Sequence, residues 1–409
     1  MPAFWVGGYS ADMAGDADGI GVLLAGASDD VLAGGALSFA GTAVDVASPS
    51  WITAHPHLDV VYAAVEGRGQ VQAYRRAGER RLTPLGDPVD AGEAVCHVAV
   101  APDGASLIAC CWGDGRVVRM ALDGVGRPSA PVVATAASDP YEGVGSGGVG
   151  GVDLGMDLSG IGGGDAGEAL AGILAGAVDL SALQGGDPAR DGDGVGDDEA
   201  GDDPREGDEV RRSRAHQARF LPAGVLATTD LGFDLVRFWR PGARSTLRTA
   251  GEVVLPRGSG PRHTVWHPSG HLYVATELSC EVFVLAPAPS GEWRIVSATS
   301  LGAGTLPADT ASEIALSRDA EHVYVGVRGS DTIATVRVRS GGAELQPVAL
   351  VESGVGGPRH HVVLRDTLLV AGRRSSEVAS LTLDERTGVP GRVRYRVEVP
   401  SPTCILPVR

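Results

Sequence analysis

The sequence predicts an all-β protein, a seven-bladed β-propeller closed by strands from its N- and C-termini. A unit of short strands, each rich in apolar and β-branched residues and bounded by Gly or Pro, recurs six times along the 409 residues. The turn prolines repeat every 46 residues, from Pro56 to Pro102 and again from Pro222 to Pro268. A period of about 40–50 residues with several strands in each unit is typical of propeller blades.

The clearest copy of the unit is Gly258–Leu285, GSGPRHTVWHPSGHLYVATELSCEVFVL. A Gly-Pro turn and an Arg-His pair lead into three predicted strands, HTVW, HLYVAT and CEVFVL, with a Pro-Ser-Gly turn between the first two. The other full copies are Ser50–Arg75, Cys96–Leu122, His216–Arg240, Ser312–Val338 and Arg359–Leu383.

The two ends of the chain supply the seventh blade. Phe4–Ser10 and Gly19–Leu24 are predicted strands, and the tail Ser401–Val408 resembles the beginning of each copy. We therefore expect the tail to form the innermost strand of this blade and the N-terminus to form its outer strands. Such closure pairs the otherwise free edges of the ring, so deletion of Ser401–Arg409 should destabilise it.

A single propeller domain is expected over residues 1–409, with an acidic insert at residues 141–210. The insert carries 17 acidic and two basic residues, which account for −15 of the net charge of −17. It is rich in Gly and Asp and poor in aromatic residues, so we expect it to be disordered. Asp191–Glu199 resembles a calcium-binding loop, but Ala189 and Ala200 stand where the end ligands belong, which favours a solvated linker.

The composition excludes several classes of protein. The chain has no lysine and no asparagine, so a P-loop lysine, a lysine Schiff base and N-glycosylation are excluded. No basic footprint for nucleic acid, no apolar run long enough for a membrane and no signal peptide is visible. Five scattered cysteines without a CxxC pair indicate reduced thiols. We therefore expect a cytoplasmic monomer without a metal or another cofactor.

Polar residues gather where the innermost strand of each blade should begin. Channel walls are often merely solvated, but so many convergent ionisable groups favour a functional site at one mouth of the channel. Glu277 ends the second strand of its copy, where it either reaches this mouth or is solvated. Alignment of the copies places Trp51, His97, Gln217, His263, Glu313, His360 and Cys404 at one position, and Ser50, Cys96, His216, Arg262, Ser312, Arg359 and Thr403 at the position before it.

The residue types in these two sets point to an anionic ligand. Two arginines beside several histidines favour a carboxylate or a phosphate. A Glu or His side chain is suited to act as general base on a water, and an Arg side chain to stabilise an oxyanion. The absence of a G-x-S-x-G motif argues against a serine acyl-enzyme, and three His on three blades are weak evidence of a metal site.

With these motifs the chain resembles the lactonase family of seven-bladed β-propellers, which includes bacterial 6-phosphogluconolactonases and the fungal carboxymuconate-lactonising enzyme. The resemblance covers nearly all of the chain outside the insert. The motifs that carry it are AHQ (Ala215–Gln217), DLGFD (Asp230–Asp234), GPRH (Gly260–His263 and Gly357–His360), TEL (Thr276–Leu278), SEIALS (Ser312–Ser317) and the terminal PTCIL.

The resemblance implies a metal-free hydrolysis of a sugar δ-lactone, with 6-phosphogluconolactone of the pentose phosphate pathway as the expected substrate. In our hypothesis Glu277 or His216 activates a water, while two arginines bind the anionic group and the developing oxyanion. The implied catalytic group is His216, Arg262, Glu277 and Arg359, and the expected substrate-binding residues are His97, His263, Glu313 and His360.

Two alternatives to the hydrolase stay open, a muconate-type lactone cycloisomerase and a non-catalytic propeller that binds a metabolite or a protein. The sequence also departs from the family. Arg214 stands where a His usually precedes AHQ, and many members have Asn at the positions of Cys111, Thr276 and Val327. These changes either alter the choice of substrate or follow from the chain's lack of Asn.

Overall fold

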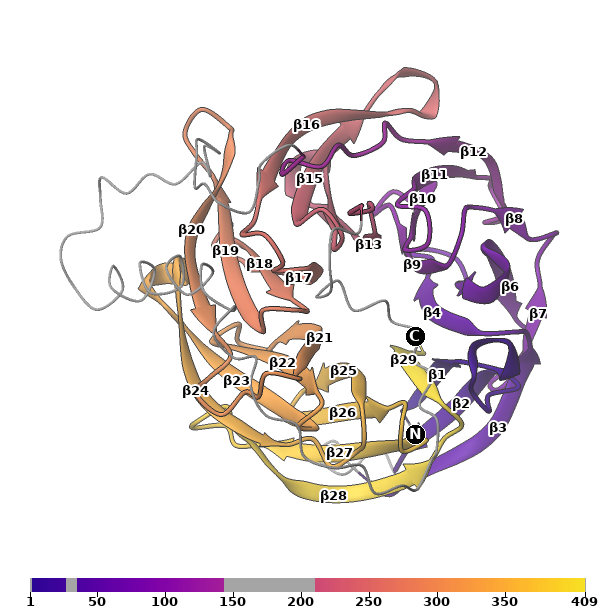
Figure 1. Ribbon diagram of the computed structural model, residues 1–409. Coiled ribbons are helices and arrows are strands. Elements are labelled where there is room, and N and C mark those ends of the chain that lie inside the picture. The colour runs from indigo at the N-terminus through magenta and orange to yellow at the C-terminus, as the bar shows by residue number, and fades with distance from the viewer. Residues whose placement is uncertain (1, 27–34, 143–209, 409) are drawn as a thin grey trace, which may run out of the picture. The chain divides into compact units, whose positions relative to one another are not determined.

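The computed structural model describes residues 2–26, 35–142 and 210–408. Its strands form seven antiparallel sheets that stand like blades around a central channel (Figure 1). Residues 2–26, 35–142 and 212–408 belong to one compact unit. The predicted all-β seven-bladed propeller is thereby confirmed. The predicted disorder and the candidate calcium loop of the insert fall within residues 143–209, which lie outside the described residues.

Each blade has four main strands in the same order. The innermost strands are β29 (Pro402–Pro407), β4 (Pro49–Ala54), β9 (Val95–Val100), β13 (Ala215–Leu221), β17 (Pro261–Trp266), β21 (Thr310–Leu316) and β25 (Pro358–Leu364). The second strands are β1 (Ala3–Gly8), β5 (Val60–Val65), β10 (Ser106–Cys111), β14 (Val225–Asp230), β18 (Leu272–Thr276), β22 (His322–Arg328) and β26 (Thr367–Gly372).

The third strands are β2 (Gly19–Ala25), β6 (Gln70–Arg76), β11 (Val117–Leu122), β15 (Leu235–Pro241), β19 (Glu281–Pro287), β23 (Thr332–Arg339) and β27 (Glu377–Leu383). The outer strands are β3 (Leu37–Asp45), β7 (Leu82–Pro84), β12 (Pro128–Val133), β16 (Leu247–Val254), β20 (Trp293–Ser300), β24 (Glu344–Glu352) and β28 (Pro390–Glu398), and the short β8 (Val89–Asp90) also pairs with β6.

Helical structure in the described ranges is limited to single 3-10 turns, and none of these is long and apolar enough to cross a membrane. The turns are η1 (Ala11–Met13), η2 (Glu66–Arg68), η4 (Pro222–Gly224), η5 (Ala243–Ser245) and η6 (Ser340–Gly342).

The ring closes as the sequence predicts, because the C-terminal β29 forms the innermost strand of the blade that β1, β2 and β3 complete. The register runs antiparallel from Phe4 opposite Pro407 to Gly8 opposite Pro402. Gly7 lies on the side of this blade that meets the next one, and a Cβ atom there would lie 2.3 Å from the carbonyl oxygen of Pro49. Glycine is therefore needed where the two ends of the ring join.

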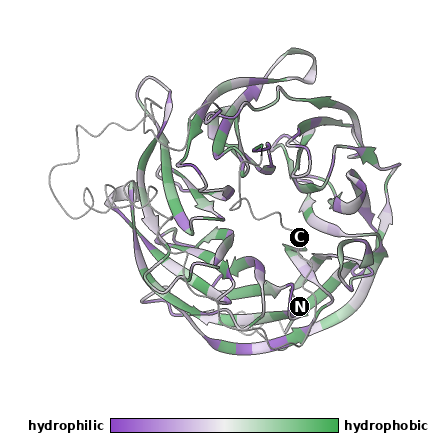
Figure 2. Cartoon of the chain, viewed as in Figure 1, coloured by the Kyte–Doolittle hydropathy of each residue, from purple (hydrophilic) through white to green (hydrophobic). Residues whose placement is uncertain are grey.

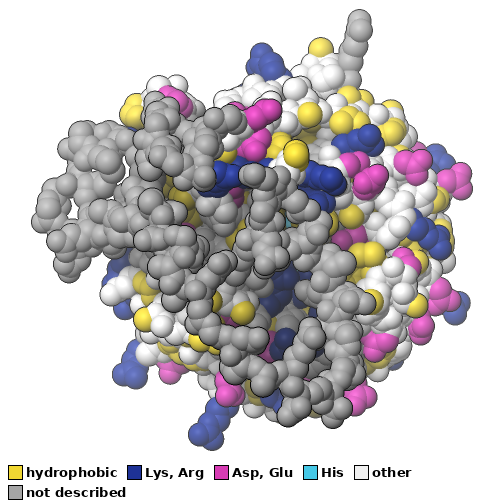
Figure 3. Space-filling model, in the orientation of Figure 1, with side chains coloured by type: hydrophobic (Ala, Val, Ile, Leu, Met, Phe, Trp, Pro, Cys, Tyr) yellow, Lys and Arg dark blue, Asp and Glu magenta, His cyan; other side chains and the backbone are white. Residues whose placement is uncertain are grey.

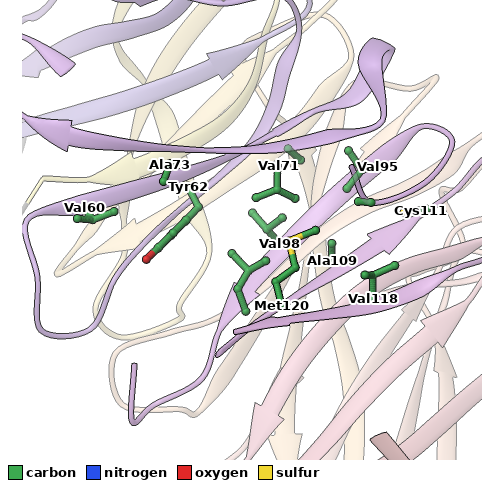
Figure 4. Close-up of a cluster of buried hydrophobic side chains, with 13 residues drawn as sticks. Val60, Tyr62, Val71, Ala73, Val95, Val98, Ala109, Cys111, Val118 and Met120 are labelled. Carbon is green, nitrogen blue, oxygen red and sulfur yellow. The ribbon is translucent and has the colours of Figure 1, made fainter. Parts of the chain in front are cut away.

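The hydrophobic core lies between the faces of neighbouring blades. Second strands such as β5 and β10 are buried along their whole length, whereas outer strands such as β28 alternate between exposed and partly buried residues. Figure 2 shows this difference in hydropathy between the inner and outer parts of the blades. In one cluster Tyr62 and Val98 come from adjacent blades and pack together with Met120 (Figure 4). Burial on both faces explains why the inner strands are near-continuous apolar runs.

Tyrosines on three second strands tie neighbouring blades together. The hydroxyl of Tyr62 donates to the carbonyl of Gly126 at 2.7 Å, and that of Tyr273 donates to Gly342 at 2.9 Å. The Tyr324 hydroxyl makes the same bond to the corresponding turn of the blade after it. A buried tyrosine needs a partner for its hydroxyl, and here each partner is a turn in the adjacent blade.

Candidate functional site

A β-bulge interrupts the beginning of the innermost strand in all seven blades. In the blade of β4, Pro49 pairs with Val65 and Trp51 pairs with Ala64, so that Ser50 between them is an extra residue. Bulges redirect a side chain out of the regular alternation of the strand. The equivalent positions in the ring hold Ser50, Cys96, His216, Arg262, Ser312, Arg359 and Thr403.

Six of these seven bulge residues line one pocket at the end of the channel, and its empty volume, including the part open to solvent, is about 280 Å³. Ser312 is the exception, because its hydroxyl is bonded to the carbonyl oxygens of Pro358 and Gly326. Figure 3 shows arginine side chains gathered near the centre of this face of the molecule. The lining consists of Ser50, Trp51, Glu66, Cys96, His216, Arg262, His263, Arg359 and Thr403.

Below the bulge residues, Trp51 and a layer of histidines form the floor of the pocket. The centre of the Trp51 ring lies 4.4 Å from that of His97, 5.2 Å from that of His263 and 5.1 Å from that of His360. Glu313 places Oε2 2.8 Å from His263 Nδ1 and 3.4 Å from His360 Nε2. His97, His263, Glu313 and His360 are buried, and Trp51 is partly exposed.

The floor separates the residues expected to bind substrate into two groups. His263 lines the pocket, whereas His97, Glu313 and His360 do not. Burial lowers the pKa of His97 and His263 well below the usual range, and lowers that of His360 to about 4. These rings are therefore neutral at pH 7. The backbone N–H groups of Ala218, Ile314 and Ile405 donate to His97, Glu313 and His360, respectively.

Paired loops hold the two pocket arginines. Gly260, before Arg262, has φ +64° and donates its backbone N–H to Asp234 Oδ1 at 2.8 Å. Gly357, before Arg359, has φ +63° and donates to Asp331 Oδ1 at 2.7 Å. Glycine has no Cβ atom and adopts this left-handed conformation at no steric cost. The two GPRH motifs are thus turns, each anchored by an aspartate of the preceding blade.

Arg262 belongs to a row of charged groups in which Glu277 lies between Arg262 and Arg328. Its Nε lies 2.7 Å from Glu277 Oε2, and the other oxygen of Glu277 lies 2.8 Å from a terminal nitrogen of Arg328. Burial lowers the pKa of Arg262 to about 10, so the guanidinium stays charged at neutral pH. Its Nη1 is buried and has no hydrogen-bond partner within the described residues. This donor is available to a ligand.

A second row crosses the blades on the other side of the pocket. Arg359 donates to the hydroxyl oxygen of Tyr9 at 2.8 Å, and that hydroxyl donates to Glu66 Oε2 at 3.2 Å. Arg373 stacks over the same tyrosine ring at 4.9 Å. Glu66 is 7% exposed and lines the pocket.

Sequence reasoning missed Tyr9, Glu66, Arg328 and Arg373, although it considered Glu277. All five directly follow the residue that pairs opposite the start of the bulge, so they form one ring at the ends of the second strands. Aligning the copies at this position, in addition to the turn prolines, would have found them.

His216 combines burial with an unused nitrogen. Its Nδ1 is buried without a hydrogen-bond partner in the part of the chain that is described. Burial, reinforced by Arg262 and His263, lowers the pKa of His216 well below the usual range. A neutral imidazole with a free nitrogen is the state that accepts a proton from water.

The departures from the family pattern lie beside the pocket. The guanidinium of Arg214 stacks 3.9 Å above the Trp112 ring and donates to the carbonyl oxygens of Trp112 and Gly113. Thr276 accepts the N–H of Glu281 at 3.1 Å and bonds to Ser279, which holds the turn after Glu277. Neither Arg214 nor Thr276 lines the pocket.

The fold and the site together define a seven-bladed propeller with a polar, arginine-rich pocket at one end of its channel. Residues 3–145 and 174–407 match the family described as "Lactonase, 7-bladed beta-propeller". The chain belongs to this lactonase family, as the motifs predict.

A relative agrees with this assignment, and solved structures share the fold. A 6-phosphogluconolactonase of Bacillus subtilis is 32% identical over 206 residues, which are 47% of this chain and 57% of the relative. The chain thus spans little more than half the length of such curated relatives. The periplasmic gluconolactonase of Pseudomonas aeruginosa has the same fold with a TM-score of 0.73, 21% identity and coverage of 100% and 99% of the two chains. A Lactobacillus plantarum protein matches with a TM-score of 0.72 at 18% identity over 100% of both chains.

Proposed function

We propose that this protein is a lactonase that hydrolyses the ester of a sugar lactone, with 6-phosphogluconolactone as substrate and 6-phosphogluconate as product. The observation that carries the proposal is the pocket itself. It places a neutral His216, with a free Nδ1, beside the charged Arg262 and Arg359. These are the groups that water activation and the binding of an anion require.

In the proposed reaction His216 Nδ1 takes a proton from water while the water oxygen attacks the lactone carbonyl carbon. The carbonyl π electrons move to oxygen, and Arg262 Nη1, which has no hydrogen-bond partner within the described ranges, donates to that oxyanion. Removal of one such donor typically costs about 10²–10³ in kcat. Arg359 supplies a positive charge for the anionic group of the substrate.

Glu277 suits a positioning role better than that of general base. Burial by itself raises the pKa of Glu277, but Arg328 and Arg262 lower it below the usual range overall. Both oxygens of Glu277 already face arginines, and Glu277 does not line the pocket, whereas His216 does. Of the two base candidates, we therefore assign water activation to His216 and the orientation of Arg262 to Glu277.

The names of relatives and of solved structures with the same fold support a small lactone substrate. Relatives named for 6-phosphogluconolactone and gluconolactone share the family or the fold. The proposed location is the cytoplasm, and the proposed ligand is a small anionic lactone.

The test is hydrolysis of freshly generated 6-phosphogluconolactone, measured against the spontaneous rate and beside unphosphorylated gluconolactone. We expect acceleration of both, with a higher kcat/KM for the phosphorylated lactone that Arg359→Ala reduces. Acceleration of a muconate lactone alone would support the cycloisomerase. If the protein accelerates the hydrolysis of none of these lactones, the proposal is contradicted, and a non-catalytic binding scaffold becomes the better interpretation.

A further inference from the structure

Two glutamates occupy equivalent positions on the pocket ring, three blades apart. Glu66 directly follows Val65, which pairs with Pro49. Glu277 directly follows Thr276, which pairs with Pro261. The two side chains thus start from equivalent positions in the fold, but Glu66 lines the pocket and Glu277 lies beside it, against Arg262.

Glu277 contacts two charged arginines, whereas Glu66 contacts a neutral tyrosine. Both oxygens of Glu277 lie within 2.8 Å of an arginine nitrogen, one from Arg262 and one from Arg328. Glu66 instead receives a hydrogen bond from the neutral hydroxyl of Tyr9. Arg359 reaches that hydroxyl, so the tyrosine stands between its charge and Glu66.

These surroundings favour different protonation states. Burial raises the pKa of Glu66, and Arg359 offsets this only in part. For Glu277 the two arginines outweigh burial, and the pKa falls. An enzyme that needs both an acid and a base at one pH can use two similar groups whose surroundings move their pKa values apart.

We propose that Glu66 is a catalytic residue, the proton donor to the ring oxygen of the lactone as the ester bond breaks. This inference rests on the proposed lactonase function. When the tetrahedral intermediate collapses, the C–O bond electrons go to the ring oxygen, and the carboxyl proton of Glu66 goes with them to form the hydroxyl group. The proton that His216 took from water returns to the Glu66 carboxylate through solvent. The net change is one water added across the ester.

The geometry places the donor and the base in one cavity. Glu66 and His216 both line the pocket, but they come from different blades, after β5 and in β13. Water can thus be activated from one side of the lactone while the ring oxygen is protonated from another. Tyr9 is a positioning residue in this scheme, because its hydroxyl holds Glu66 Oε2.

Glu66→Gln separates proton donation from packing. The amide keeps an oxygen that accepts from Tyr9 but has no acidic proton. When the ester bond breaks, the ring oxygen of a sugar δ-lactone leaves as an alkoxide, whereas that of dihydrocoumarin leaves as a phenoxide. A phenoxide needs little protonation because a phenol has a pKa of about 10. We expect Glu66→Gln to lower kcat on gluconolactone by about 100-fold and to change kcat on dihydrocoumarin far less. Glu252→Gln, on the exposed β16, is the matched control.

The pH profile is a second readout with gluconolactone alone. The wild-type kcat should fall at alkaline pH as Glu66 loses its proton, and this limb should be absent from Glu66→Gln. Equal losses on both substrates, no loss on either, or an unchanged alkaline limb would overturn the proton-donor role while leaving the lactonase intact. A wild-type protein that accelerates neither lactone would instead contradict the proposed function itself.

Discussion

Arg262 and Glu277 form an ion pair beside the pocket, with Nε 2.7 Å from Oε2. Arg262 is 3% exposed. The other oxygen of Glu277 contacts Arg328, on the side of Glu277 away from Arg262. This row orients a guanidinium whose buried Nη1 has no hydrogen-bond partner among the described residues. The relationship between these two residues leads to the first prediction.

Glu277→Gln should lower kcat/KM on 6-phosphogluconolactone by about 10–100-fold, because the guanidinium loses its fixed orientation. The measurement is a steady-state assay with the spontaneous rate subtracted. Glu252→Gln removes the carboxylate of the Arg237–Glu252 pair outside the pocket and should leave kcat/KM unchanged. An unaltered kcat/KM in Glu277→Gln would contradict the positioning role.

The histidine floor predicts a loss of stability in mild acid. The pKa of His360 is about 4 in the folded protein and about 6.5 when unfolded. Below pH 6.5 the unfolded chain therefore binds a proton that the folded chain does not, so stability falls as pH falls. From pH 7.5 to 5, His360 alone should cost about 2 kcal/mol.

Urea unfolding of the wild-type protein and of His360→Gln at both pH values checks this sign. The variant loses less stability on acidification than the wild-type protein does, by about that amount. If the difference in unfolding free energy between the two proteins is the same at pH 7.5 and pH 5, the floor histidine is not the cause.

The tyrosine ties between blades predict a small, specific loss of stability. Tyr273→Phe removes the bond from its hydroxyl to Gly342 and leaves a buried carbonyl oxygen without that partner. The expected cost is about 1 kcal/mol. Tyr395→Phe, on the outer strand β28, is the control. Equal unfolding free energies for both variants would show that the tie contributes nothing.

Much of the fold could be predicted from the sequence because each blade repeats the same local pattern. The turn prolines gave the period, and the tail Ser401–Val408 was placed correctly as an innermost strand. The fourth strand of each blade was missed. An outer strand such as β20 faces solvent and has few buried residues, so its sequence lacks the apolar run that marks the inner strands.

The candidate site was harder to predict than the fold. Alignment found Arg262 and Arg359, but it could not show that a bulge turns them into the pocket while the residues after them form a floor. Bulges depend on pairing with another strand, which one strand's sequence does not specify. Glu66 was overlooked because EGRG after an apolar run has the composition of a solvated turn.

Closure of the ring gives the fourth prediction. Deletion of Ser401–Arg409 removes β29, exposes the edge of β1 and uncovers cores that contain Cys404 and Ile405. We expect loss of cooperative unfolding, because the net stability of a domain is only about 5–15 kcal/mol. Ile405→Val, with a cost of about 0.5–1.5 kcal/mol, gives the graded comparison. A truncated protein with the wild-type Tm would contradict the closure.

The central claim is that lactone hydrolysis takes place in the pocket of His216 and Arg262. The most direct measurement is kcat/KM on fresh 6-phosphogluconolactone for the wild-type protein, His216→Ala and Arg262→Ala. His271→Gln, in the turn at the other end of β17, is the control. The account predicts a wild-type rate above the spontaneous one, kept in His271→Gln and reduced by about 100-fold or more in the two pocket variants. Wild-type activity retained in both pocket variants would contradict it.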